Sequence, residues 1–243
     1  MILDNRVFVT GAGRGGTSLL TGLLDAHSAV TMEFEFGAGP FFVDPSEQAA
    51  EERLAEFRRE CDNRAAQSAS PIWGNKITTG QIAFLSEGRY STDVADVDDP
   101  LLEQLFLVHF ARWKVIFVLR EGTACVDSKR RRDGLDDDES ADRWIYSVRL
   151  LRFLQLRHPS LHCVRFEELV HEPERVLQGV CDFLGIAYED SMLNGTMNPK
   201  MRPEYRRGHF ERSATSPVEV SPELAIRIAP AMRLAGYTVA PPR

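Results

Sequence analysis

The chain consists mainly of short apolar runs and the longer segments between them, in which apolar residues recur at helical spacing. Strands are expected in five runs that are short and rich in β-branched or aromatic side chains, at residues 6–9, 29–32, 71–79, 113–120 and 161–166. Strands of this composition, with helical segments between them, are typical of a parallel sheet that is buried on both faces. The pattern therefore predicts an α/β fold, a single domain with a parallel β-sheet flanked by helices.

Helices are expected where apolar residues recur at three- and four-residue intervals. The predicted helices cover residues 18–24, 46–67, 101–112, 143–157 and 222–234, and a further helix opens at Pro173. Two acidic segments, 93–99 and 133–142, are expected to be solvated loops. Residues 190–218 are polar and interrupted by glycine and proline, which predicts a lid or loop segment. This segment is expected to belong to one domain that spans residues 1–243.

Composition narrows the classes of function. The 243 residues carry a net charge of −7, so a general nucleic-acid binder is not expected. Four cysteines without a C-x-x-C pair, and no signal peptide or membrane-spanning run, favour a cytoplasmic protein with reduced thiols and no membrane partner.

A glycine-rich segment lies between the first predicted strand and the first predicted helix. Gly11 and Gly16 have the spacing of a phosphate-binding loop, whose ligand-contacting residues would be Gly13, Arg14, Gly15, Gly16, Thr17 and Ser18. Glycines let the backbone approach a ligand closely, and the amides that start the next helix attract an anion. Thr17 stands where ATP- and GTP-binding loops carry a lysine, which argues against ordinary triphosphate chemistry and makes Arg14 the substitute cation. A tight turn without a ligand is the competing interpretation.

Two glutamates follow the second predicted strand. In an extended chain Glu33 and Glu35 share one side, and Phe34 and Phe36 the other. Burial beside the aromatic rings would raise a carboxylate pKa toward the range of a general base. An exposed polar strand edge is an equally good interpretation of these residues taken alone.

The strand at 113–120 ends in a cation, Arg120. Nucleoside-triphosphate hydrolases often end the corresponding strand in an aspartate that binds magnesium. A cation at this position indicates that the strand end meets an anionic ligand, although a salt-bridged arginine would give the same sequence.

These segments resemble those of the PAPS-dependent sulfotransferases, in particular bacterial members (PAPS is 3′-phosphoadenosine 5′-phosphosulfate). The glycine-rich loop is similar to the 5′-phosphosulfate loop of that family, and Arg120 with Ser128 is similar to its 3′-phosphate motif. The resemblance covers most of the chain up to about Ile186. One departure is the lack of the proline that the family usually has near Gly122.

The resemblance also implies roles for residues outside these two motifs. Several bacterial members place a catalytic glutamate shortly after the first helix, which favours Glu35, with Glu33 second, as the general base. Lys76 corresponds to a strand-end lysine near the transferred group, and Thr78 stands where cytosolic animal members have a histidine base. A basic pair and glycine that close over the 3′-phosphate correspond to Arg206, Arg207 and Gly208.

The resemblance implies a P-loop-like fold and transfer of a sulfuryl group from PAPS to a hydroxyl or amine, which leaves adenosine 3′,5′-bisphosphate. The acceptor would be a small molecule or a carbohydrate, and no metal is expected because no metal-binding pattern is visible. Two alternatives stay open. One is a P-loop nucleotide or small-molecule kinase, and the other is a non-catalytic protein that binds an adenine nucleotide.

Overall fold

A five-stranded sheet forms the centre of the molecule. The computed structural model describes residues 5–44, 48–86, 88–215 and 218–238. All adjacent strands pair in parallel, in the order β2-β3-β1-β4-β5. The strands are β1 (Arg6–Gly11), β2 (Val30–Phe34), β3 (Ile72–Lys76), β4 (Lys114–Leu119) and β5 (Leu161–Arg165). The predicted parallel sheet is thereby confirmed, and its carboxyl ends all lie along one edge.

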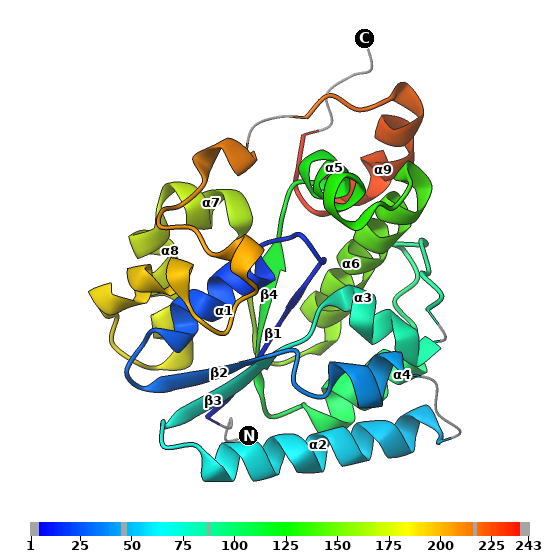
Figure 1. Ribbon diagram of the computed structural model, residues 1–243. Coiled ribbons are helices and arrows are strands. Elements are labelled where there is room, and N and C mark those ends of the chain that lie inside the picture. Colours follow the sequence, from blue (N-terminus) through cyan, green and yellow to red (C-terminus); the bar gives the residue numbers. More distant parts are fainter. Residues whose placement is uncertain (1–4, 45–47, 87, 216–217, 239–243) are drawn as a thin grey trace.

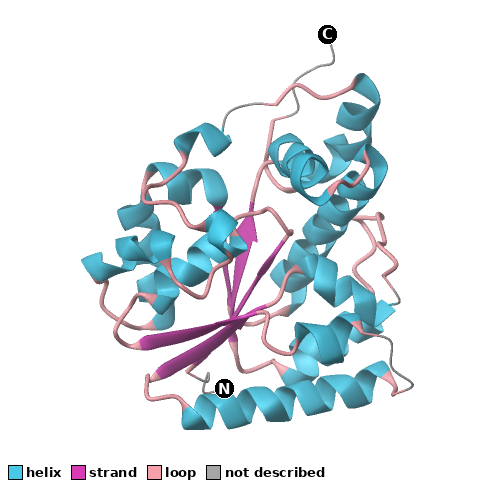
Figure 2. Ribbon diagram, viewed as in Figure 1, coloured by secondary structure: helices cyan, strands magenta, loops and turns pink. Residues whose placement is uncertain are grey.

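Helices cover both faces of this sheet (Figures 1 and 2). The α-helices are α1 (Thr17–Asp25), α2 (Ala50–Gln67), α3 (Thr79–Ile82), α4 (Pro100–Leu102), α5 (Gly122–Asp133), α6 (Asp137–Arg157), α7 (Phe166–His171), α8 (Pro173–Leu184) and α9 (Pro222–Leu234). Shorter π- or 3₁₀-helical segments are η1 (Gly39–Val43), η2 (Ala83–Ser86), η3 (Glu103–His109), η4 (Asp190–Met197), η5 (Pro203–Tyr205) and η6 (Arg212–Thr215).

Alternating side chains of the strands build two separate cores. In β1, Phe8 packs on the face covered by α2, α6 and α9, whereas Val7 and Val9 pack on the face covered by α1, α7 and α8. The same alternation in β4 sends Phe117 to the first core and Val118 to the second. Because both faces are buried, the strands have the nearly continuous apolar sequence seen above.

One predicted loop is helical. Residues 137–142 were expected within an acidic loop, but they form the first turns of α6. The carboxylate of Asp136 caps this helix by accepting a hydrogen bond from the amide of Glu139, and the acidic first turn is favoured by the helix dipole. The helix predicted from residue 46 is observed from Ala50, and residues 45–47 lie outside the described part of the chain.

The acidic segment at residues 93–99 is a loop, as expected, and side-chain contacts hold it against the rest of the fold. Arg149 of α6 is buried and donates to the carbonyls of Asp96 and Asp98 and to the carboxylate of Asp99. A buried guanidinium needs such partners, so this contact orders the loop against α6.

The polar segment after α8 is anchored to α1 by close backbone contact. A Cβ atom at Gly22 would lie 2.6 Å from the carbonyl oxygen of Gly195. Asn198 extends this contact by donating to the carbonyl of Gly22 and to the carboxylate of Asp25. The start of the predicted lid therefore has a defined position beside the helix that follows the glycine-rich loop.

None of the helices in the described residues is both long enough and apolar enough to cross a membrane.

The contact at Gly22 predicts an unusual response to alanine. Gly22→Ala should lower the free energy of unfolding by about 2 kcal/mol because the methyl group forces α1 and η4 apart. Helix propensity alone would raise the free energy of unfolding by up to about 1 kcal/mol. Urea unfolding of the wild type and the variant measures the change in this free energy.

Gly179, within α8, provides the matched control. A Cβ atom there would meet only the His162 ring, at 4.0 Å, so Gly179→Ala should stabilise the protein by about 0.5–1 kcal/mol. Equal stabilisation by both substitutions would contradict the close packing of α1 against η4.

Candidate functional site

The loop between β1 and α1 is a tight turn that only glycine can complete. Its first half is closed by a hydrogen bond of 2.8 Å from the amide of Gly15 to the carbonyl of Ala12. Gly16 has a φ of 95°, and a Cβ atom there would collide with the ring of Phe166. The chain thus passes under Phe166 and enters α1 immediately afterwards.

The start of α1 is open to a ligand. No side chain in the described part of the chain caps this helix, and its first turn contains no acidic residue. The first amides of a helix have no intrahelical acceptor, and the helix dipole adds partial positive charge at this end. Phosphate and sulfate groups are the natural ligands of such an arrangement.

Arg14, inside the loop, is held in a left-handed conformation with a φ of 70°. This conformation costs a residue other than glycine about 1 kcal/mol. Its side chain donates from Nε to the hydroxyl of Ser128 at 3.4 Å and from Nη1 to the hydroxyl of Tyr205 at 2.6 Å. The guanidinium also stacks on the Tyr205 ring, 4.8 Å from its centre, which helps to offset the backbone cost.

Arg120 follows the end of β4 and connects three parts of the site. Its guanidinium donates to the carbonyl of Arg14 at 2.8 Å and to the carbonyl of Ala214 at 2.7 Å, and it stacks on Phe166. Its Nε is buried and has no partner within the described residues. The cation therefore keeps its full charge and one free donor beside the glycine-rich loop.

Glu35 and Lys76 form an ion pair at the carboxyl ends of β2 and β3. Lys76 Nζ lies 2.5 Å from Glu35 Oε1, and Lys76 is 3% exposed. The backbone places the carboxylate there, because Glu35 has a φ of 64° and its amide donates to the carbonyl of Lys76. The pair faces the same cavity as the loop.

Burial and charge act in opposite directions on this pair. Burial alone would raise the pKa of Glu35, but the Lys76 ammonium, by its charge and its hydrogen bond, holds that pKa below 4.5. Burial lowers the pKa of Lys76 below 10.5, and the carboxylate of Glu35 opposes this effect. Glu35 is consequently ionised at neutral pH.

Glu33 has a different environment. It lies in β2 opposite Asn75 of β3, and its carboxylate faces Arg64 of α2 at 3.5 Å. It is not among the residues that line the cavity. Because the chain leaves the extended conformation at Glu35, the two glutamates do not share one environment.

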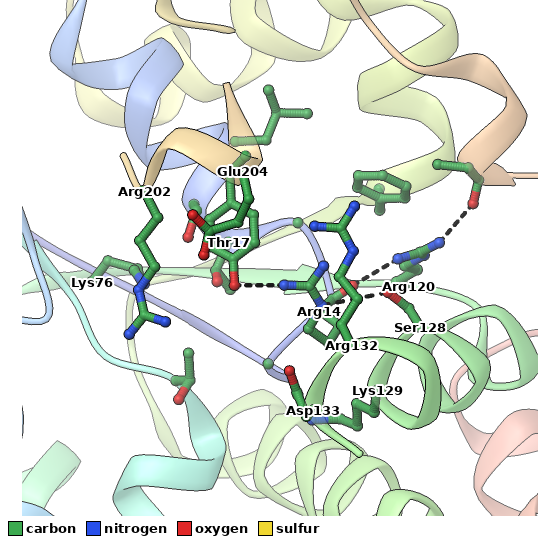
Figure 3. Close-up of a pocket in the computed structure, with 18 of the residues that line it drawn as sticks. Arg14, Thr17, Lys76, Arg120, Ser128, Lys129, Arg132, Asp133, Arg202 and Glu204 are labelled. Atoms are coloured by element: carbon green, nitrogen blue, oxygen red, sulfur yellow. Dashed lines mark hydrogen bonds between the residues drawn. The ribbon is translucent and has the colours of Figure 1, made fainter. Parts of the chain in front are cut away.

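A cavity of about 890 Å³ joins these groups at the carboxyl edge of the sheet. Figure 3 shows Lys76 and Arg202 on one side and Arg120 and Ser128 on the other, with Arg14 between them. Nine lysine and arginine side chains line the cavity, against four carboxylates. The cavity is therefore strongly cationic in a chain of net negative charge.

Most of the predicted site residues line this cavity. They are Gly13, Arg14, Gly16, Thr17, Ser18, Glu35, Lys76, Arg120, Ser128 and Arg207. Arg206, in contrast, donates to the carbonyls of Pro199 and Met201, and neither Arg206 nor Gly208 is among the lining residues. Gly15 supports the loop from behind, through its bond to Ala12.

The sequence analysis did not identify several polar residues that line the cavity, among them Lys129, Arg202 and Tyr205. Lys129 could have been found, because it lies one helical turn after the apolar Cys125 and thus on a buried face of α5. Arg202 and Tyr205 lie in a segment without hydrophobic periodicity, and no sequence signal identifies them.

No group of three or more histidine, cysteine, aspartate or glutamate side chains with the geometry of a metal site occurs in the part of the chain that the structure describes.

Comparison with solved structures shows where this architecture recurs. The sulfotransferase domain of the Synechococcus PCC 7002 olefin synthase superposes with a TM-score of 0.68 at 17% identity, covering 99% of this chain and 98% of that one. The sulfotransferase domain from the curacin biosynthetic pathway gives 0.65 at 18% identity, covering 99% and 100%. Mouse sulfotransferase SULT7A1, complexed with PAP, gives 0.52 at 13% identity, covering 97% and 91%.

Sequence comparison agrees with the fold. A predicted protein-tyrosine sulfotransferase of Caenorhabditis briggsae is 22% identical over 211 residues, which cover 79% of this chain and 69% of that protein. The sequence model of the sulfotransferase family matches residues 6–190, which include β1 to β5 and the cavity residues contributed by them. The chain therefore belongs to the sulfotransferase family.

Proposed function

We propose that this sulfotransferase uses PAPS as its donor and Glu35 as its general base, with a hydroxyl or amine of a small-molecule or carbohydrate acceptor as the group that is sulfated. The observation that carries the proposal is that one cavity contains both the open start of α1 and the Glu35–Lys76 pair. An anionic donor bound at the start of α1 would therefore lie in the same cavity as a carboxylate that can act as a base.

The donor is assigned from the charges along the cavity. The loop amides and Arg14 suit the 5′-phosphosulfate, because both present hydrogen-bond donors at the end of β1. Arg120 and the Ser128 hydroxyl suit the 3′-phosphate, which a guanidinium binds through charge-assisted hydrogen bonds. Arg207, which lines the cavity from the segment after η5, would close over the same phosphate.

The chemistry follows from the position of the ion pair. The acceptor oxygen or nitrogen attacks the sulfur atom, the bond from sulfur to the bridging oxygen breaks, and Glu35 takes the acceptor proton. Negative charge develops on the 5′-phosphate of the departing adenosine 3′,5′-bisphosphate, where Lys76, Arg14 and the loop amides stabilise it. An anionic donor beside Lys76 also competes with Glu35 for the ammonium, which raises the pKa of Glu35 and makes it a stronger base.

Donor choice is tested by calorimetric titration with adenosine 3′,5′-bisphosphate and, separately, with ATP and magnesium. The wild-type protein should bind the bisphosphate and bind ATP weakly. Arg120→Ala should weaken bisphosphate binding about 10- to 100-fold, because a charge-assisted contact to the 3′-phosphate is lost.

Arg130→Ala is the matched control for this experiment. Arg130 lies on the same helix as Ser128, but it is exposed and outside the cavity lining, so bisphosphate affinity should stay at the wild-type value. Tight magnesium-dependent ATP binding with no response to the bisphosphate would replace the proposal with a kinase.

The base is tested by paired substitutions of the two glutamates. Release of adenosine 3′,5′-bisphosphate from PAPS is measured with a panel of alcohols, phenols, amines and sugars. Glu35→Gln should lower kcat by about 10²- to 10⁴-fold, the usual contribution of a general base. Glu33→Gln should have a small effect because that carboxylate faces Arg64, and the opposite ranking would move the base to Glu33.

The ion pair predicts the acid limb of the pH–rate profile. In the wild-type enzyme, kcat/KM for the donor, which reports the free enzyme, should fall only as the pH drops through the lowered pKa of Glu35. Lys76→Met removes the cation but leaves the carboxylate buried, so the pKa of Glu35 rises and the limb moves to higher pH. The shift is measured from profiles recorded at pH values where circular dichroism shows a folded protein. An acid limb that does not move would contradict the effect of Lys76 on the pKa of the base.

A further inference from the structure

Lys129 of α5 is a buried lysine without a partner among the residues that the structure describes. It is 4% exposed and lines the cavity. Its ammonium group makes no hydrogen bond or ion pair within residues 5–44, 48–86, 88–215 and 218–238, whereas Lys76 is paired with Glu35. Lysine side chains are almost never buried to this degree unless they are paired.

The glycine-rich loop lies directly against the Lys129 ammonium group. A Cβ atom at Gly13 would stand 3.2 Å from Lys129 Nζ, so the amine reaches the loop at its first ligand-facing residue. Cys125, one turn earlier on α5, makes a second contact by donating from Sγ to the carbonyl of Gly13 at 3.5 Å. The face of α5 that carries these two residues is therefore packed on the loop.

The charged groups around Lys129 do not neutralise it. Burial lowers its pKa below 10.5, and the nearby cations Arg143 and Arg14 lower it further. Asp133 acts in the opposite direction, but it is exposed and forms no ion pair with Lys129. Cys125 is a neutral thiol at physiological pH because burial raises its pKa.

The proposal rests on the donor assigned above. We propose that Lys129 binds the 5′-phosphosulfate end of the donor, and supplies from α5 the cation that the loop lacks at Thr17. An anion at the loop would give the Lys129 ammonium group the partner that the described residues do not provide.

Geometry favours this end of the donor over the 3′-phosphate. Arg120, assigned to the 3′-phosphate, stacks on Phe166 and contacts Ala214 in η6. Lys129 instead contacts Gly13 and lies beside Asp133 on the α5 side of the pocket (Figure 3). The two cations thus approach the loop from different directions and can hold different groups of one nucleotide.

Contact at this end would also matter for transfer. When the bond from sulfur to the bridging oxygen breaks, the electron pair stays on that oxygen and the charge of the 5′-phosphate increases. Lys129, from α5, would stabilise this negative charge, together with Lys76 from β3.

Calorimetry with three adenylates tests the assignment, using Lys129→Met to keep the volume and remove the charge. The ligands are PAPS, adenosine 3′,5′-bisphosphate and adenosine 3′-phosphate. The variant should lose about 10- to 100-fold in affinity for PAPS and keep wild-type affinity for adenosine 3′-phosphate. A loss for the bisphosphate as well places the contact on the 5′-phosphate, and a loss for PAPS alone places it on the sulfuryl group.

Lys114→Met is the matched control, because Lys114 lies at the opposite end of β4 and donates to the carbonyl of Leu184. All three affinities should match the wild type in this variant. Equal losses for all three adenylates in Lys129→Met, or no loss for any, would overturn the assignment. Failure of the wild-type protein to bind any adenylate would instead overturn the proposed donor, and the assignment with it.

Two further measurements do not depend on nucleotide affinity in the variant. The wild-type protein should take up protons when it binds PAPS in a series of alkaline buffers that reaches the lowered pKa of Lys129, because the ligand raises that pKa. Titrations in buffers of different ionisation enthalpy measure this uptake, and its absence would count against the contact. Without ligand, Lys129→Met should be at least as stable to urea as the wild type, because a buried unpaired charge is removed; marked destabilisation would indicate a structural role.

Discussion

Positive charge concentrated at the carboxyl edge of the sheet is the constraint on which the rest of the structure depends. Nine cationic side chains line one cavity in a protein whose net charge is −7. Like charges at such short range repel one another, and burial increases the cost. Burial of apolar side chains in the two cores on either side of the sheet must therefore offset the free-energy cost of this repulsion.

Neutral dipoles hold the two arginines beside the glycine-rich loop, whereas Arg131 and Arg143, farther along the cavity wall, pair with Asp127 and Glu139. Arg120 is bound by two backbone carbonyls, and Arg14 by the hydroxyls of Ser128 and Tyr205. Such partners satisfy hydrogen bonds and leave the net charge intact, so the cavity can still attract an anion. Among the described residues that line the cavity, Lys76 and Glu35 form the closest ion pair, and this carboxylate is the base in the proposed mechanism.

Local patterns predicted the parts of this site that depend on local geometry. Loop spacing predicted Gly13, Arg14, Gly16, Thr17 and Ser18, and the strand end predicted Arg120, because the ends of parallel strands must share one edge. Lys76 was assigned from the resemblance to the sulfotransferases. Glu33 and Glu35 could not be separated, since their difference arises from a positive φ at Glu35 that a non-glycine residue rarely adopts. The prediction of a loop at the acidic start of α6 was wrong, because capping and the helix dipole stabilise the helix there despite its low hydrophobicity.

Several features of the site are unfavourable for the protein without ligand, and they converge on one point. Arg14 is in a left-handed conformation. Within the described chain, the start of α1 is uncapped and the buried Lys129 has no partner. Each costs folding free energy, and one anion at the loop would relieve two of them directly by accepting hydrogen bonds from the α1 amides and from Lys129. Strain of this kind persists where function requires it. These three unfavourable features surround one loop, and an anion bound there, as proposed, would offset part of their cost.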